Sequence, residues 1–246
     1  MKCNKDGGGE YMKSEIPIST GFDKLDQKIG GGLFPGELIV VAGRPLVGKT
    51  TFVFSMAQRM RNKRKLNIAF FSLQTEFEQL FEKTGRTNHN ESDVTPQKKN
   101  SIIVDDTAGI SVVQLGRKCI ECKREHDIDI VFIDYFQLMS GDDSCESRIL
   151  ELDFIAFRMK QLAVALNIPI VLVVQQGRAI EQNGELQPMI SELRESGSIA
   201  QMADTIMMLY REEADWQNCE KKEGIKIYIE KQSHGETGVV EEDLNE

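Results

Sequence analysis

The sequence contains no apolar run long enough to cross a membrane. Its longest apolar stretches, such as residues 168–174, fall far short of the ~20 residues that a transmembrane helix needs. The N-terminal segment is polar and has no apolar core of a secretory signal. We therefore expect a soluble, cytoplasmic protein that makes no use of a membrane.

An excess of positive charge is also absent. Thirty Lys and Arg residues stand against 39 Asp and Glu residues, which gives a net charge of −9 at pH 7. This balance argues against a broad basic surface that coats nucleic acid. It does not exclude a small nucleic-acid site, because binding is local and net charge is a sum.

Cysteine is sparse and odd in number, with five residues at positions 3, 119, 122, 145 and 219. A chain of this size needs no disulfide staples, so we expect reduced thiols. Cys119 and Cys122 share a predicted helix, but no second pair follows at the spacing of a zinc site. A metal or redox role is therefore less favoured than two small side chains on a buried helix face.

Apolar strand patterns alternate with helical patterns over about 200 residues. The strand patterns are continuous β-branched and aromatic runs, which is typical of strands covered by helices on both faces. The alternation predicts an α/β fold with a mostly parallel sheet, closed by a C-terminal hairpin that includes Val239 and Val240. Strands are expected at 37–41, 67–72, 102–104, 129–134, 168–174, 205–210 and 224–230, and helices at 49–60, 111–126 and 146–167.

Two of these helices carry further patterns. In the helix over 146–167 we assign a set of apolar residues to the core: Ile149, Leu152, Ile155, Phe157, Met159 and Leu162. The helix over 49–60 ends in a basic run: Arg59, Arg61, Lys63, Arg64 and Lys65. Cations complement the negative end of a helix dipole, so a structural role is favoured over a nucleic-acid patch.

A phosphate-binding loop follows the first strand. Residues 43–50 read Gly43-Arg44-Pro45-Leu46-Val47-Gly48-Lys49-Thr50, which fits G-x-x-x-x-G-K-[ST] without a mismatch. The glycines let backbone N–H groups wrap a phosphate, and the helix that starts at Lys49 adds the positive end of its dipole. Lys49 is expected to reach the β- and γ-phosphates, and the Thr50 hydroxyl to bind Mg²⁺. We extend the nucleotide-binding set to Thr51.

A second half of such a site is a carboxylate that ends a neighbouring buried strand. The run Ile130-Val131-Phe132-Ile133-Asp134 has this form and lies about 85 residues after the P-loop. Asp134 is therefore the second candidate ligand for Mg²⁺.

With these two motifs placed, the sequence resembles the C-terminal ATPase domain of DnaB-type replicative helicases, a RecA-like branch of the P-loop proteins. The matching segments include TGFDKLDQKIGGGLFPGELIVVAGRPLVGKTTF, KREHDIDIVFIDYFQLM, QQGRAIEQ, SELRESGSIAQMADTIMMLYRE and EKQSHGETG. They run in the family's order over residues 18–240. Residues 1–17 are polar and include the run Gly7-Gly8-Gly9, so we expect a flexible lead-in there. The resemblance implies one RecA-like ATPase domain at 18–246, ATP and Mg²⁺ as cofactors, single-stranded DNA as partner, and a hexameric ring or association with a related helicase.

The same resemblance assigns roles to residues outside the P-loop. Gln175 matches the glutamine that couples the γ-phosphate to the DNA-binding loops, and Arg211 matches an arginine that packs near the base. Lys231 matches a lysine at the nucleotide site between subunits. Three residues of LRESGSI match the loop that touches DNA phosphates: Arg194, Glu195 and Gly197. On residue types alone, this stretch also fits an exposed, ion-paired helix end.

The sequence departs from the family at two catalytic positions. The family's S-L-E reads Ser72-Leu73-Gln74 here, and glutamine orients water but accepts no proton. Glu76 lies two residues further on and is the candidate substitute. The family's K-x-R-x-G has Ser233 in place of its arginine, beside His234. In related phosphoryl transfer such an arginine is worth ~10³–10⁵ in rate.

Two functions therefore remain open from the sequence. The first is an ATP-driven, ring-forming DNA translocase of the replicative helicase class. The second is a nucleotide-binding, hydrolysis-deficient module that joins or regulates a ring. A KaiC-like or recombinase-type ATPase is a third and less favoured interpretation.

Overall fold

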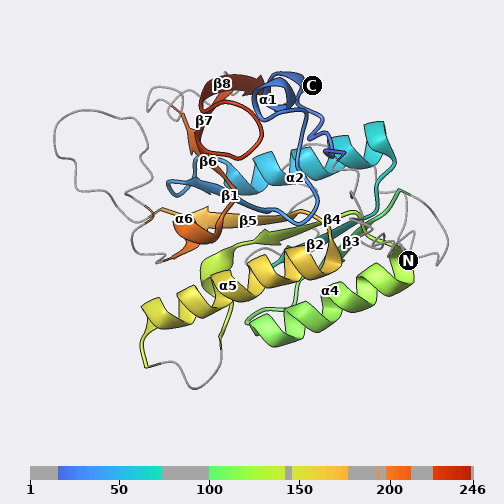
Figure 1. Ribbon diagram of the computed structural model, residues 1–246, viewed down its shortest axis with the longest axis vertical. Coiled ribbons are helices and arrows are strands. Elements are labelled where there is room, and N and C mark those ends of the chain that lie inside the picture. The colour runs from blue at the N-terminus through green and yellow to red at the C-terminus, as the bar shows by residue number, and fades with distance from the viewer. Residues whose placement is uncertain are drawn as a thin grey trace, which may run out of the picture.

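A mostly parallel sheet of eight strands forms the centre of the molecule (Figure 1). The computed structural model describes residues 16–73, 100–141, 146–176, 193, 198–211 and 224–244, and the statements below concern these residues. The strand order is β3-β2-β4-β5-β1-β6-β7-β8, with parallel pairing up to β6 and antiparallel pairing for β7 and β8. The bounds are β1 Leu38–Gly43, β2 Ile68–Ser72, β3 Ile102–Asp105, β4 Ile130–Asp134, β5 Ile170–Gln175, β6 Thr205–Tyr210, β7 Gly224–Lys231 and β8 Gly238–Asp243. The α/β fold and its C-terminal hairpin are confirmed.

Helices cover both faces of the sheet. In Figure 1, α4 and α5 lie below the sheet and α2 lies above it. Ser111 caps α4, because its hydroxyl accepts from Gln114 N while the Gln114 side chain accepts from Ser111 N. The bounds are α1 Asp23–Lys28, α2 Lys49–Arg59, α4 Val112–His126, α5 Arg148–Leu166 and α6 Ile199–Met202, with a π-helical turn Met60–Arg64 and a 3-10 turn Phe136–Leu138. None of the helices in these ranges combines the length and apolar character needed to cross a bilayer.

Two apolar cores result, one on each side of the sheet. One lies under α4 and α5, and the other lies under α1 and α2. Strands β1, β2 and β4 are buried at every position because both of their faces meet helices. Cys119 is part of the first core, as predicted, and burial raises the pKa of its thiol.

The assignment of core residues in α5 is wrong at two positions. Ile149 and Phe157 are 57% and 46% exposed, whereas Leu152, Ile155 and Met159 are buried. Apolar residues occur nearly all round this helix, so its pattern does not define which side packs. The sheet and the neighbouring helix make that choice.

The basic run after α2 has structural contacts. The Arg59 guanidinium lies 4.2 Å from the centroid of the Phe22 ring and donates to the Asp243 carbonyl. Arg61 donates to the Asn100 carbonyl, and Lys63 donates to that of Gly21. For these three residues the structural interpretation is confirmed.

Candidate functional site

The P-loop connects the end of β1 to the start of α2. Gly48 has φ +98°, a left-handed conformation that side chains rarely adopt, and Lys49 begins the helix. A Cβ at Gly43 would lie 2.9 Å from Val47 Cγ1 and 3.1 Å from the Leu209 carbonyl oxygen. Both glycines are therefore required by the path of the backbone, which is the arrangement that presents N–H groups to a phosphate.

Lys49 lies across this loop. Its ammonium donates to the carbonyl oxygens of Gly43 and Arg44, at 2.9 and 2.8 Å. Burial lowers the pKa of Lys49 to about 8, and the negative charge of Asp134 opposes this shift. Lys49 and Asp134, which the sequence places on separate elements, therefore belong to one site.

Asp134 reaches this site because β4 ends beside the P-loop. The residue is only 2% exposed, and its carbonyl accepts from Leu73 N at 2.6 Å. This hydrogen bond joins the ends of β2 and β4. Gln74 and Glu76 follow directly along the chain but lie outside the described residues.

Gln175 ends β5 opposite Gly43, its partner in the sheet register. The side chain of Gln137 brackets its backbone, donating to Gln175 O at 2.8 Å and accepting from Gln175 N at 3.1 Å. Gln137 follows Asp134 by one 3-10 turn, so it ties the end of β4 to the end of β5. Sequence reasoning assigned no role to Gln137; its position just after the strand carboxylate is the signal that could have found it.

Arg211 lies beside the P-loop at the end of β6. Its Cζ and Nη2 atoms lie 3.9 Å from the position that a Cβ of Gly48 would occupy. The structure thus brings together the predicted residues Gly43, Gly48, Lys49, Asp134, Gln175 and Arg211 at the carboxyl edge of the parallel strands.

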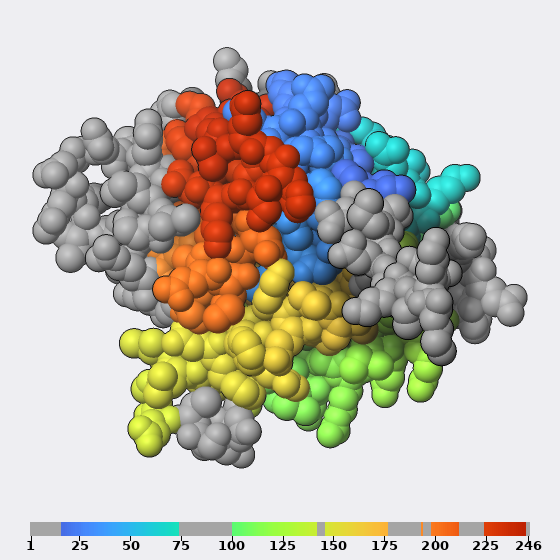
Figure 2. Space-filling model, in the orientation of Figure 1, coloured from blue at the N-terminus to red at the C-terminus, as the bar shows by residue number. Residues whose placement is uncertain are grey.

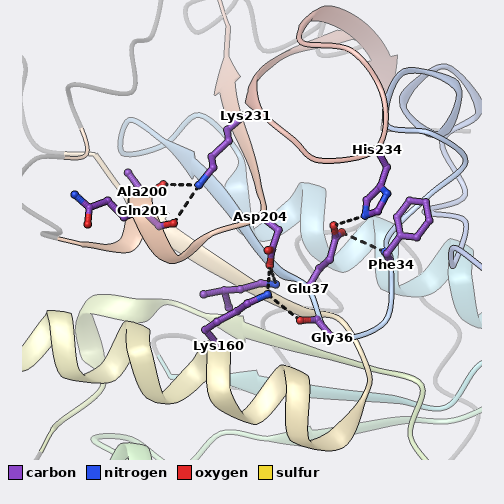
Figure 3. A network of polar contacts seen from close by, with 10 residues as sticks. Phe34, Gly36, Glu37, Lys160, Ala200, Gln201, Asp204, Lys231 and His234 are labelled. Carbon is purple, nitrogen blue, oxygen red and sulfur yellow. Dashed lines mark hydrogen bonds and ion pairs between the residues drawn. The ribbon is translucent and has the colours of Figure 1, made fainter. Parts of the chain in front are cut away.

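The predicted inter-subunit residues lie at the opposite edge. Lys231 ends β7 and pairs with Ile206, near the start of β6, whereas the P-loop adjoins Leu209. At ~3.3 Å per residue, these two places are roughly 10 Å apart along the strands. Lys231 donates to the carbonyls of Ala200 and Gln201, both at 3.1 Å (Figure 3). Ser233, two residues further along the chain, is exposed.

The predicted DNA-contacting residues Arg194, Glu195 and Gly197 lie outside the described residues. Ser198, directly after this segment, lies within the described residues, and its N–H donates to the Asp153 carboxylate at 2.7 Å. This contact fixes the start of α6 against α5.

Comparison with known families decides the identity of this fold. The sequence profile of the DnaB-like helicase C terminal domain matches residues 17–98 and 83–245. The chain belongs to this family. The recognition made from the P-loop, the strand carboxylate and the RESGSI segment is confirmed.

Relatives of this DnaB-like domain are replicative helicases. The chain is 35% identical over 244 residues to the replicative DNA helicase DnaB of Geobacillus stearothermophilus, and 35% identical over 243 residues to the replicative DNA helicase DnaC of Bacillus subtilis. Each alignment covers 91% of the chain, and 54% and 53% of the respective relative. The chain therefore spans about half the length of these relatives.

Solved structures agree with the assignment. A DnaB-like replicative helicase, described with its interactions with primase, superposes with a TM-score of 0.78 at 27% identity, covering 92% of this chain and 59% of that one. A separate ATPase domain superposes with a TM-score of 0.77 at 26% identity, covering 94% and 89%.

The donor set of the DnaB-like site suits a nucleotide with Mg²⁺. Mg²⁺ is usually held by one or two protein oxygen groups together with phosphate oxygens, and Thr50 and Asp134 supply a hydroxyl and a carboxylate. Among the described residues, no group of three His, Cys, Asp or Glu side chains forms a protein-only metal cage. The lysine adjacent to this carboxylate supplies the positive charge for phosphates.

Nucleotide affinity is expected to fall as the pH rises through about 8, because the lowered pKa of Lys49 removes its charge in the free protein above that value. Linkage limits the fall to about tenfold per pH unit. Titration of a fluorescent ATP analogue between pH 7 and pH 9.5 measures it. Lys49→Arg is the control, since its guanidinium stays charged, and an equally steep fall in Lys49→Arg would contradict the assignment.

Proposed function

We propose that this domain binds ATP with Mg²⁺ and couples the state of the nucleotide to single-stranded DNA within a ring that translocates on or unwinds DNA during replication in the cytoplasm. The proximity of Lys49 and Asp134 at the carboxyl edge of the sheet carries the nucleotide part of the proposal. The family and its helicase relatives support the DNA part.

The roles follow from the geometry. Lys49 exchanges the carbonyls of Gly43 and Arg44 for phosphate oxygens when a nucleotide binds. Thr50 and Asp134 would hold Mg²⁺, which when bound neutralises charge on the β- and γ-phosphates. Arg211 lies where it can contact the nucleotide beside Gly48. Gln175 ends β5, the strand that leads toward the proposed DNA-contacting segment, and its hydrogen bond with the Gln137 side chain links this strand to the nucleotide edge of the sheet.

A ring explains the position of Lys231. Because Lys231 and Ser233 lie at the far edge of the sheet, any nucleotide that they serve belongs to a neighbouring copy. Head-to-tail contacts of this kind form a ring when the rotation between successive copies closes. Arg194, Glu195 and Gly197 are proposed to contact DNA phosphates from the segment before α6.

A second candidate function is a nucleotide-binding module that hydrolyses ATP slowly or not at all. Gln74 and Ser233 favour it, because they replace the family's base and arginine while the residues that hold ATP and Mg²⁺ are present.

Steady-state ATP turnover and molar mass in solution, each with and without single-stranded DNA, test the proposal. DNA-stimulated turnover together with a hexamer supports the motor. Nucleotide binding without turnover supports the second function. A protein that binds no nucleotide would contradict both.

A further inference from the structure

The loop between β7 and β8 (residues 232–237) is held against its own chain by His234 (Figure 3). The His234 ring stacks on Phe34, with centroids 3.7 Å apart and planes at 21°. Its Nε2 lies 3.1 Å from Glu37 Oε1, and Glu37 Oε2 accepts from Phe34 N at 3.3 Å. Glu37 therefore contacts both members of the stacked pair, and the His234 ring is turned toward its own chain.

This contact is shielded from water on the carboxylate side. The Glu37 side chain is 9% exposed, against 34% for His234. Burial raises the pKa of Glu37, while the hydrogen bond from Phe34 and the charge of His234 lower it. Asp204 and Lys160 also face this carboxylate, with opposite effects on its pKa. Removal of the imidazole would leave a poorly solvated carboxylate, so the contact specifies one position for the loop.

The rest of the loop fits closely onto residues 28–37. A Cβ at Gly30 would lie 2.7 Å from the His234 carbonyl oxygen, and one at Gly235 would lie 2.4 Å from the Lys28 carbonyl oxygen. Glu236 N donates to Lys28 O at 3.0 Å. The loop therefore follows the surface of the segment that leads directly into β1.

The base of the same hairpin has a second attachment. The Lys231 ammonium is held by two carbonyls of α6, the helix that follows the proposed DNA-contacting segment. The end of β7 and the loop after it are thus attached at two places. His234 attaches the loop to the segment just before β1, and Lys231 attaches the end of β7 to α6. Figure 3 shows both attachments on either side of the Asp204–Lys160 ion pair.

We propose that His234 is a positioning residue for the nucleotide site of the neighbouring copy of this chain. His234 fixes loop 232–237 on Phe34 and Glu37. Because Lys231 directly precedes this loop, its position is fixed as well, and from there it reaches phosphates bound by the P-loop of the adjacent copy. The inference rests on the proposed function, because only a ring brings such a neighbour into reach. A displacement of ~1 Å of a group that serves a reacting site can lower the rate on the order of 10²-fold. The anchoring of this loop therefore has a functional consequence.

The test uses His234→Ala with Glu236→Ala as the matched control. Glu236 lies on the same loop and forms an ion pair with Lys28 at 3.2 Å, but its side chain is 84% exposed. Affinity for a fluorescent ATP analogue is measured with Mg²⁺ and single-stranded DNA, a readout that requires no hydrolysis. We expect His234→Ala to bind about tenfold more weakly, corresponding to one lost charged hydrogen bond, and Glu236→Ala to match the parent.

Mixing subunits separates positioning from a loss of fold. His234→Ala keeps an intact P-loop, and Lys49→Ala keeps an intact loop 232–237. An assembly of the two therefore contains composite sites with both parts intact, and sites of parental affinity are expected to reappear. A second readout is the double variant His234→Ala/Lys231→Ala, which is expected to bind no more weakly than Lys231→Ala alone.

Three results would overturn the inference: parental affinity in His234→Ala, no recovery on mixing with Lys49→Ala, or a monomer at every nucleotide and DNA concentration. The proposed nucleotide function fails separately. It is contradicted when the parent and Lys49→Ala bind the analogue equally, whatever His234→Ala does.

Discussion

Replacement of Lys49 with alanine is expected to abolish nucleotide binding at working concentrations. The ammonium lies across the P-loop, where it donates to the carbonyls of Gly43 and Arg44. In the proposed complex with ATP, the same ammonium donates to phosphate oxygens. Hydrogen bonds to charged groups are worth about 1.5–3 kcal/mol each, so the loss of two corresponds to a decrease in affinity of roughly 10²-fold or more.

Titration calorimetry with ATP and Mg²⁺ measures this effect. Lys123→Ala is the matched control, because Lys123 pairs with Asp127 on the surface of α4, away from the P-loop. A thermal melt of both variants checks the fold. If Lys49→Ala bound ATP as the parent does, the nucleotide site would have to be sought elsewhere.

Restoration of the two missing catalytic groups is expected to raise ATP turnover by about 10²-fold or more. Gln74→Glu supplies a general base, an effect worth ~10²–10⁴, and Ser233→Arg supplies the cation whose counterpart is worth ~10³–10⁵ in related phosphoryl transfer. In the proposed ring, these two residues act on one nucleotide from different subunits, so the double variant is expected to exceed either single variant.

Steady-state phosphate release with single-stranded DNA measures the gain in turnover. Lys49→Ala, introduced into each variant, gives the background rate of phosphate release. Glu76→Gln discriminates between the two candidate functions. If the parent already turns over rapidly and Glu76→Gln abolishes the rate, Glu76 is the base and the hydrolysis-deficient interpretation is wrong. If the parent is inactive and the substitutions restore turnover, the domain has kept its nucleotide site and lost its hydrolytic groups.

Much of the fold could be predicted from local pattern. Strands β1, β2 and β4 are continuous apolar runs because helices cover both of their faces, and such runs can be recognised in the sequence alone. The Ser111 cap is equally local, since it depends on side chains three residues apart. The helix α5 shows the limit of this approach. Its apolar residues do not define one side, so Ile149 and Phe157 were assigned to a core that they do not join.

The sequence by itself determined the P-loop, the strand carboxylate and the family, because each depends on residue types at fixed spacing along the chain. Only the tertiary structure decided which of these residues share a site. The order β2-β4-β5-β1 carries Asp134 and Gln175 to Lys49, and hydrogen bonding between strands far apart in sequence sets that order. The same holds for the bracket of Gln137 on Gln175 and for His234, which turns back to Phe34 and Glu37. Such contacts join distant parts of the chain, and no local spacing encodes them.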